Sequence, residues 1–362
     1  MREGDKRIAL LGATGSIGRQ ALEVIGESPS LGVCALASGS QSLDELAATY
    51  DVEHVQVGGD VTELLERSEP DVVLNAIVGF AGVGATLWSL ERGVMLALAN
   101  KESLVAAGDL AVDAWQRGEG LLVPVDSEHS AAFQLLDGRA METVESLVLT
   151  ASGGPFRNRS LAELESASVE EALAHPTWSM GPKITIDSAT LANKGLELIE
   201  AHFLFGLEYE RIEVLVHPSS IVHALVRLRD GAALAHLGHP DMRVPISFAL
   251  TYPERHATSV PALDFSAGLT LEFEEPDNER FPLLRLARDA GERGGTFPCA
   301  FNAANEVAVA AFLLGTIGFL DIAAVVEDAL AAVDGAPVRD LAELVEVDAE
   351  VRRIAAGRRA AA

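Results

Sequence analysis

The chain has 362 residues, of which 49% are hydrophobic and 22% are charged, and its formal net charge is -27. Its length exceeds what one hydrophobic core usually organises and predicts roughly two or three domains, while its composition is that of a globular protein. The negative charge opposes binding to nucleic acid or to an anionic membrane, so neither is an expected partner.

The N-terminal residues and the cysteines indicate the cellular compartment of the protein. A strand-like run begins at about residue 7, which leaves no targeting segment and predicts a cytoplasmic protein. Residues 72–90 are uncharged, but their Asn, Gly, Thr and Ser content and their strand-like first half argue against a membrane span. Cys34 and Cys299 lie far apart in apolar surroundings, so we expect two core residues and no disulfide framework or metal cluster.

Residues 1–147 alternate strand-like apolar runs with helical segments. The runs are RIALLG, VCALAS, HVQV, DVVLNAIV, VMLALAN, LLVPV and SLVLTA. Continuous apolar runs are typical of strands that are buried on both faces of a parallel sheet. We therefore predict a doubly wound α/β domain of the Rossmann type.

The first strand runs into GATGSIG, residues 12–18, and then into a helix. Small residues let the backbone approach a pyrophosphate, and a helix N-terminus donates N–H groups to it. The motif predicts dinucleotide binding, with a merely structural turn as the alternative. After the second strand, Gly39, Ser40 and Gln41 stand where an NAD site usually has an acidic residue, and this absence favours NADP.

Two carboxylates, Asp126 and Glu128, follow the run LLVPV, at the end of a strand where open sheets bind ligands. If the chain stays extended there, both side chains point to one face and can converge on one hard cation such as Mg²⁺ or Mn²⁺. His129 would then lie on the other side and support the fold. General acid–base catalysis by the pair, and capping of the next helix by Asp126 and Ser127, are the alternatives.

Residues 148–253 predict an α+β catalytic domain with a polar loop, a helix and a hairpin. The loop at 174–182 contains HPTWSMGP and suits a mobile lid, with a turn anchored by its Trp as the alternative. On the helix, Asn193 and Glu197 share a face beside Lys194, and Ser188 lies near the helix start. These residues could hold a metal and a phosphate, and a solvated helix face is the alternative.

Lysine is rare in this chain, which has four lysines among its 27 basic residues. Lys101 and Lys194 both lie in polar motifs, where a compact, mobile ammonium group suits substrate binding better than an arginine would. Chance placement of two surface lysines is the alternative.

The last third of the chain predicts a linker at 254–279, rich in Pro, Ser and acidic residues, and a helical bundle at 280–362. Asn302, Asn305 and Glu306 are expected near a helix start, where capping explains them without catalysis.

Eight motifs spread over the chain resemble the 1-deoxy-D-xylulose 5-phosphate reductoisomerase family. They are GATGSIG, ANKESLV, PVDSEHSAAF, LTASGGPF, HPTWSMGPKITIDSATLANKGLE, HPSSIVHALV, GHPDMRVPISFAL and FNAANEVAVAAF. The resemblance implies an oxidoreductase and isomerase that uses NADPH and a divalent cation, Mg²⁺, Mn²⁺ or Co²⁺. It would convert 1-deoxy-D-xylulose 5-phosphate to 2-C-methyl-D-erythritol 4-phosphate in the methylerythritol phosphate route to isoprenoids. The resemblance also suggests a homodimer.

The resemblance assigns roles to individual positions. The implied metal ligands are Asp126, Glu128 and Glu197, which would act in catalysis together with Lys101. The implied substrate-binding residues are Lys101, Ser127, Glu128, Ser152, His175, Ser188, Asn193, Lys194 and Glu197. The implied nucleotide-binding residues are Thr14, Gly15, Ser16, Ile17, Asn100, Glu102 and Gly181. At Ser40 and Gln41 the sequence departs from the family, in which many members have Lys or Arg followed by Asn.

Two other functions compete with this interpretation. A semialdehyde dehydrogenase shares such a first domain but acylates a cysteine, and neither Cys34 nor Cys299 lies in a plausible site. A non-catalytic nucleotide sensor would leave the metal-binding residues without a role.

Overall fold

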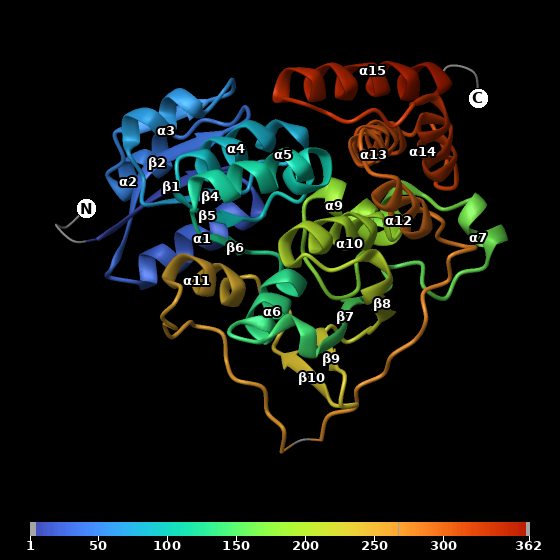
Figure 1. The fold of residues 1–362 in the computed structure, drawn as a ribbon, viewed down its shortest axis with the longest axis horizontal. Coiled ribbons are helices and arrows are strands. Elements are labelled where there is room, and N and C mark those ends of the chain that lie inside the picture. The colour runs from blue at the N-terminus through green and yellow to red at the C-terminus, as the bar shows by residue number, and fades with distance from the viewer. Residues whose placement is uncertain (1–4, 267, 360–362) are drawn as a thin grey trace. The chain divides into compact units, whose positions relative to one another are not determined.

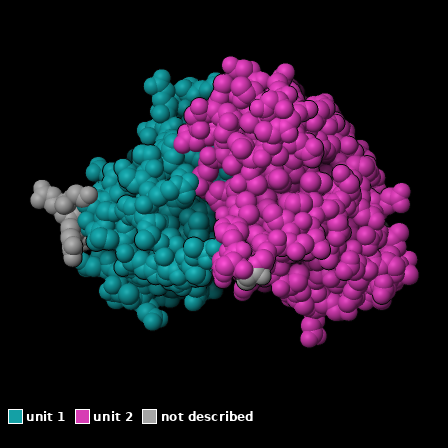
Figure 2. Space-filling model, turned by 90° about the horizontal axis from the view of Figure 1, so that it is seen from below, with its two compact units in different colours: residues 1–103, 109–133, 241–263 teal, residues 104–108, 134–240, 264–362 magenta. Residues whose placement is uncertain are grey.

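The computed structural model describes residues 5–266 and 268–359. The chain divides into two compact units, coloured separately in Figure 2. Unit 1 comprises residues 1–103, 109–133 and 241–263, and unit 2 comprises residues 104–108, 134–240 and 264–362. Each unit contains its own β-sheet.

The sheet of unit 1 has six strands in the order β3-β2-β1-β4-β5-β6, and every neighbouring pair is parallel. The strands are β1 (Lys6–Leu11), β2 (Leu31–Ser38), β3 (His54–Val57), β4 (Val72–Asn75), β5 (Met95–Leu98) and β6 (Leu122–Pro124). β2 is buried along its whole length, as its continuous apolar run requires. The predicted doubly wound α/β architecture is confirmed.

In the part of the chain that the structure describes, eight helical segments lie wholly or mainly in unit 1. They are α1 (Ser16–Glu27), α2 (Asp44–Tyr50), α3 (Thr62–Ser68), η1 (Phe80–Gly82), α4 (Val83–Glu91), α5 (Glu102–Gly118), α6 (Ser127–Leu136) and α11 (Arg243–Thr251). α11 packs beside α1 although it lies far along the chain (Figure 1). The Phe248 ring of α11 meets those of Phe133 and Tyr252 edge to face, at centroid distances of 6.2 and 5.5 Å. The contacts of α11 with α1 and with Phe133 explain why residues 241–263 belong to unit 1.

The sheet of unit 2 has four strands in the order β10-β9-β7-β8. They are β7 (Val144–Ala151), β8 (Ile212–Val216), β9 (Val222–Leu228) and β10 (Ala233–Leu237). β9 and β10 form the predicted antiparallel hairpin. The run SLVLTA is β7, and its assignment to the parallel sheet of the first region is wrong. An apolar run does not specify its partners, and β7 pairs with β8 and β9 instead.

The helices that lie mainly in unit 2 are η2 (Met141–Thr143), α7 (Leu161–Glu165), α8 (Val169–Leu173), α9 (Pro182–Ala189), α10 (Ala192–Phe205), η3 (Tyr209–Arg211), α12 (Leu283–Arg293), α13 (Phe297–Leu313), α14 (Asp321–Ala332) and α15 (Leu341–Arg359). α13 packs against α12, α14 and α15, and these four form the predicted C-terminal helical region (Figure 1). α12 also packs on α10, where a Cβ on Gly195 would lie 2.5 Å from that of Ala287.

The two units do not coincide with the regions that the sequence suggested. Residues 134–147 join unit 2, residues 241–263 join unit 1, and the helical region 280–362 shares unit 2 with most of the expected catalytic region. The linker 254–279 contains one isolated bridge, between Glu274 and Val216 at the edge of the second sheet. Within the described residues, no helix combines the length and the apolar character needed to cross a membrane.

The expected helix caps at Asn302, Asn305 and Glu306 are wrong. α13 begins at Phe297, with a proline in its first two positions, so these residues lie in its interior. Proline fits the first turn of a helix, and this signal was available in the sequence. Asn302 and Asn305 are fully buried.

Candidate active site

The turn between β1 and α1 requires glycine. Gly12 has a φ of 83°, and a Cβ on it would lie 2.3 Å from the carbonyl oxygen of Ala76. A Cβ on Gly18 would lie 2.3 Å from the carbonyl oxygen of Gly12. Thr14 and Gly15 lie in this turn, Ser16 and Ile17 begin α1, and no described side chain caps the N-terminus of α1. The backbone can therefore approach a pyrophosphate closely, as the glycine motif predicts.

The end of β2 lies at the same edge of the sheet. The backbone N–H groups of Gly12 and Ala13 both donate to the carbonyl oxygen of Ala37, at 2.9 Å. Gly39, Ser40 and Gln41 follow β2 and are exposed. The Ser40 hydroxyl and the Gln41 amide are therefore accessible to a nucleotide ribose.

Asn100 lies between β5 and α5, Glu102 is the first residue of α5, and both are buried. Nδ2 of Asn100 donates to the carbonyl oxygens of Ile77 and Gly79, at 2.7 and 2.9 Å, and to Oε2 of Glu102 at 2.9 Å. This network fixes the loop after β4. Gly181, the remaining implied nucleotide-binding residue, lies in unit 2 at the start of α9.

Asp126 and Glu128 converge for a different reason from the one expected. α6 begins at Ser127, so residues 126–128 are not extended, and the strand-spacing argument is wrong. Asp126 precedes the helix and Glu128 lies in its first turn. A carboxylate oxygen of Asp126 nevertheless lies within 4.8 Å of a carboxylate oxygen of Glu128. Ser127 donates to Oε2 of Glu128 at 2.5 Å. The start of α6 therefore brings together oxygen atoms that could bind a metal ion.

Buried partners surround Asp126. It forms an ion pair with Lys101, and their side chains are only 9% and 10% exposed. His129 is fully buried, and its Nδ1 lies 3.9 Å from Oδ2 of Asp126. The expectation that His129 faces the other side is wrong, because a helix brings residues three apart onto one face.

In unit 2, one histidine joins two hydroxyl groups. Nε2 of His175 lies 2.9 Å from Oγ of Ser152 and 3.1 Å from Oγ of Ser188. Its Nδ1 accepts hydrogen bonds from the backbone N–H groups of Thr177 and Trp178, which assigns the proton of the neutral ring to Nε2. Burial lowers the pKa of His175 and favours this neutral form. Three implied substrate-binding residues therefore meet at one point, one directly after β7, one in the lid loop and one on α9.

The start of α10 holds the other implied phosphate-binding residues. Glu197 is fully buried, and its two oxygens accept hydrogen bonds from Nδ2 of Asn193 and Nζ of Lys194, each at 2.5 Å. Lys194 is only 3% exposed. The alternative of a solvated helix face is therefore wrong, since a buried charge needs a partner or a role.

His223, which the sequence interpretation did not single out, lies against the lid loop. The Trp178 ring lies 6.4 Å from the ring of His223 on β9, and His236 on β10 lies 5.9 Å from His223. His223 is buried within the apolar run VHALV at the start of β9, and a histidine in such a run was the available signal.

The two cysteines are core residues, as expected. Both are buried and free, burial raises the pKa of the Cys34 thiol to about 11, and burial also raises that of Cys299. Neither thiol has the lowered pKa that a cysteine nucleophile needs, so the structure disfavours a semialdehyde dehydrogenase.

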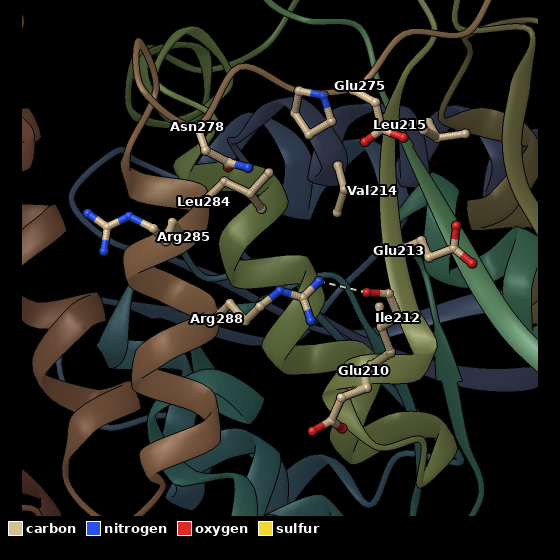
Figure 3. A pocket seen from close by; sticks show the side chains of 11 residues that line it. Glu210, Ile212, Glu213, Val214, Leu215, Glu275, Asn278, Leu284, Arg285 and Arg288 are labelled. Carbon is tan, nitrogen blue, oxygen red and sulfur yellow. Dashed lines mark hydrogen bonds between the residues drawn. The ribbon is translucent and has the colours of Figure 1, made fainter.

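A pocket of about 330 Å³ elsewhere in unit 2 contains none of the implied site residues. It lies between β8 and α12 (Figure 3), where Arg288 donates to the carbonyl oxygens of Tyr209 and Ile212 at 2.5 and 2.7 Å. Arg288 thus ties the helix to the strand.

Three family models match the chain. The model described as DXP reductoisomerase C-terminal domain matches residues 237–354, and that described as 1-deoxy-D-xylulose 5-phosphate reductoisomerase C-terminal domain matches residues 122–205. The model described as 1-deoxy-D-xylulose 5-phosphate reductoisomerase matches residues 8–61 and 41–108. The chain belongs to the 1-deoxy-D-xylulose 5-phosphate reductoisomerase family.

Relatives of this reductoisomerase family match over nearly the whole chain. The enzyme from Heliobacterium modesticaldum is 48% identical, over 98% of this chain and 97% of its own length. The enzyme from Mycobacterium ulcerans is 51% identical, over 92% and 87%. A solved structure of the Zymomonas mobilis reductoisomerase in complex with NADPH has a TM-score of 0.88 and 40% identity, covering 98% of this chain and 99% of that one. A reductoisomerase in complex with NADPH, fosmidomycin and magnesium has a TM-score of 0.90 and 39% identity, covering 98% of both chains.

Proposed function

We propose that this chain isomerises and reduces 1-deoxy-D-xylulose 5-phosphate to 2-C-methyl-D-erythritol 4-phosphate, with NADPH and a divalent cation, in isoprenoid precursor biosynthesis. One observation carries the proposal. Positions that match the family's motifs hold buried ion pairs in both units, namely Lys101–Asp126 and Lys194–Glu197.

The proposed metal ligands are Asp126, Glu128 and Glu197. Their oxygen donors fit Mg²⁺, the ion in the related complex with fosmidomycin, and Mn²⁺ and Co²⁺ are further candidates. Lewis-acid polarisation of substrate oxygens is the chemistry that such a cation supplies when bound. The Lys101 ammonium beside Asp126 would stabilise negative charge that develops on the substrate, and Ser127 would hydrogen-bond the same end.

The proposed phosphate site is the meeting point of Ser152, His175 and Ser188, together with Asn193 and Lys194. The Nε2–H of His175 and the hydroxyl and amide groups are donors, and Lys194 adds a positive charge. This phosphate lies away from the reacting carbons of the substrate. Its binding energy can therefore be used to close the lid loop 174–182 and exclude water.

The proposed NADPH site comprises Thr14, Gly15, Ser16, Ile17, Gly39, Ser40, Gln41, Asn100, Glu102 and Gly181. The tight glycine turn at the edge of the first sheet supports it. NADPH supplies the reducing equivalents when bound, while the chain orients it and excludes water. We also propose a cytoplasmic location, which suits an enzyme that uses NADPH and a sugar phosphate.

We also propose a homodimer formed through the linker. Leu269, Leu271 and Phe273 occupy alternate positions and are 42%, 39% and 37% exposed, and Phe265 is 64% exposed. Such alternation suits an extended segment that buries one face. Contiguous exposed apolar surface is typical of an interface, and a second copy of the chain is the partner that we propose.

Identification of the product tests the proposed reaction. The purified chain is incubated with 1-deoxy-D-xylulose 5-phosphate, NADPH and Mg²⁺, and the product is analysed by ¹³C NMR. The branched skeleton of 2-C-methyl-D-erythritol 4-phosphate is expected. An unbranched sugar alcohol would show reduction without isomerisation and would contradict the proposal, as would unchanged substrate.

A further inference from the structure

The short helix α9 carries a buried carboxylate next to Ser188. Asp187 is only 1% exposed, and its Oδ2 lies 2.9 Å from Nζ of Lys183, one turn earlier on α9. Its Oδ1 accepts a hydrogen bond of 2.8 Å from Nδ2 of Asn305 on α13. The residue before Ser188 is therefore tied to a helix 118 residues further along the chain.

This bond differs in kind from the apolar contacts of α9. Ile186 and Ala189 are fully buried, but packing of apolar surface is nearly non-directional and leaves a helix of eight residues some freedom to rotate. A hydrogen bond to a carboxylate is directional and strong, and breaking it leaves a buried charge with one partner fewer. The Asn305–Asp187 bond therefore fixes the rotation of α9 about its axis.

The amide oxygen of Asn305 differs from its amide nitrogen in having no hydrogen-bond partner among the described groups. Asn305 is fully buried, and no described group hydrogen-bonds its Oδ1. A buried acceptor without a partner costs free energy that an apolar residue of the same size would not. The donor group that meets Asp187 is what Asn305 contributes.

Ser188 makes two close contacts that depend on the rotation of α9. Its hydroxyl lies 3.1 Å from Nε2 of His175, and its carbonyl oxygen packs against Gly154, where a Cβ would approach it to 2.8 Å. A small rotation of α9 would break the first contact or produce a clash at the second. The position of the Ser188 hydroxyl thus depends on how α9 is held.

We propose that Asn305 and Asp187 are positioning residues of the phosphate site, which hold the Ser188 hydroxyl where His175 and the substrate phosphate meet it. The inference rests on the proposed function. The competing explanation is that the Asn305–Asp187 bond only stabilises the packing of α13.

Asn302 provides a matched control. It lies on α13, one turn before Asn305, is also fully buried, and also has an Oδ1 that no described group hydrogen-bonds. Its Nδ2 donates to Oε1 of Glu306 at 2.9 Å, within α13 itself. Asn302→Leu and Asn305→Leu make the same chemical change in one helix, but only the second removes a bond to α9.

The test compares these two variants in the full-length chain. We measure the Kd for inorganic phosphate from the NMR shift of His175, the KM and kcat for 1-deoxy-D-xylulose 5-phosphate, and the Kd for NADPH. Asn305→Leu should raise the phosphate Kd and the KM by about tenfold and lower kcat, with the NADPH Kd unchanged. Asn302→Leu should leave all four values near those of the wild type, although its melting temperature falls by a similar amount.

Two results would overturn the inference. One is a wild-type phosphate Kd in folded Asn305→Leu, and the other is equal weakening by both substitutions. If Asn305→Leu does not fold, Asp187→Asn keeps the shape and removes the charge. It should weaken phosphate binding about threefold, and no weakening would refute the inference.

The same measurements separate this inference from the proposed function. A chain that binds phosphate in an Asn305-dependent way but leaves 1-deoxy-D-xylulose 5-phosphate unchanged would refute the proposed function alone. Turnover together with phosphate binding that is independent of Asn305 would refute the positioning role alone.

Discussion

At the scale of single residues, Glu197 has both oxygens hydrogen-bonded by donors on the preceding turn of α10. Glu197→Gln keeps the size of the side chain but removes the charge that a divalent cation requires. We expect the Mg²⁺ concentration for half-maximal turnover to rise at least about tenfold, as for the loss of an interaction that supports a metal site. A Mg²⁺ titration of turnover measures this.

The control for Glu197→Gln is Glu306→Gln on α13. Glu306 also accepts hydrogen bonds from two side chains, Asn302 and Arg352, but lies outside the proposed site. It should keep the wild-type Mg²⁺ requirement. An unchanged requirement in Glu197→Gln would remove that residue from the ligand set.

His175 provides a prediction about pH. Burial lowers its pKa below the ordinary value of 6.5, so the ring of the free protein is neutral at pH 7. A phosphate dianion beside Nε2 favours the imidazolium form and should raise this pKa. NMR titration, with His175→Gln to assign the resonance, should show a midpoint below 6.5 that moves upward with inorganic phosphate. A midpoint above 6.5 in the phosphate-free protein would contradict this account.

Ser40 provides a prediction about the nucleotide. It is exposed after β2, where an acidic residue would repel the 2′-phosphate of NADPH and bind the free ribose hydroxyls of NADH. Ser40→Asp should lower the ratio of kcat/KM for NADPH to that for NADH by about tenfold or more. Ser42→Asp, on the next exposed serine, should change the ratio less. An unaltered ratio in Ser40→Asp would place the 2′-phosphate elsewhere.

At the scale of elements, the turn after β7 depends on a glycine that permits α9 to approach. Gly154 has a φ of 66°, and a Cβ there would lie 2.8 Å from the carbonyl oxygen of Ser188. Gly154→Ala should lower the free energy of unfolding by about 1–3 kcal/mol, because alanine is strained at this φ and its Cβ would clash with Ser188. It should also weaken phosphate binding. Gly138→Ala has a similar φ of 68° but open space around it, and should lower stability without affecting phosphate. Equal phosphate affinity in the two variants would contradict the proposed role of this turn.

The elements that the sequence predicted well are those specified by local pattern. The parallel strands, the β9–β10 hairpin and α10 follow from apolar runs, turn residues and helical periodicity. The predicted sheet of β7 and the predicted extended conformation of residues 126–128 were wrong, because local sequence decides neither of them. β7 matches either sheet by composition, and α6 starts at Ser127, two residues after the apolar run LLVPV ends.

The site shows the same limit. The sequence named Ser152, His175 and Ser188 through the family resemblance, and the structure brings these three together. The sequence could not reveal the Asn305–Asp187 hydrogen bond, because a contact across 118 residues leaves no local pattern. The contact of His223 with Trp178 leaves no local pattern either, although a histidine in a mainly apolar strand was an available signal.

At the scale of the whole molecule, the exposed apolar side chains of the linker predict that two copies of the chain associate. The double variant Phe265→Asp/Leu269→Asp should change the mass in solution from twice that of the chain to that of one chain, as measured by light scattering. Charges in the centre of an interface oppose association. Leu161→Asp, at a residue of α7 that is 48% exposed, is the control and should remain dimeric. A wild-type chain that is monomeric would refute the proposed dimer.

The chelator dependence of turnover tests the central claim most directly. The chain is mixed with 1-deoxy-D-xylulose 5-phosphate and NADPH, and NADPH oxidation is followed with EDTA and then with excess Mg²⁺. The account predicts substrate-dependent oxidation that EDTA abolishes and that Mg²⁺ restores. Oxidation that continues undiminished in EDTA, or no oxidation when Mg²⁺ is present, would contradict it.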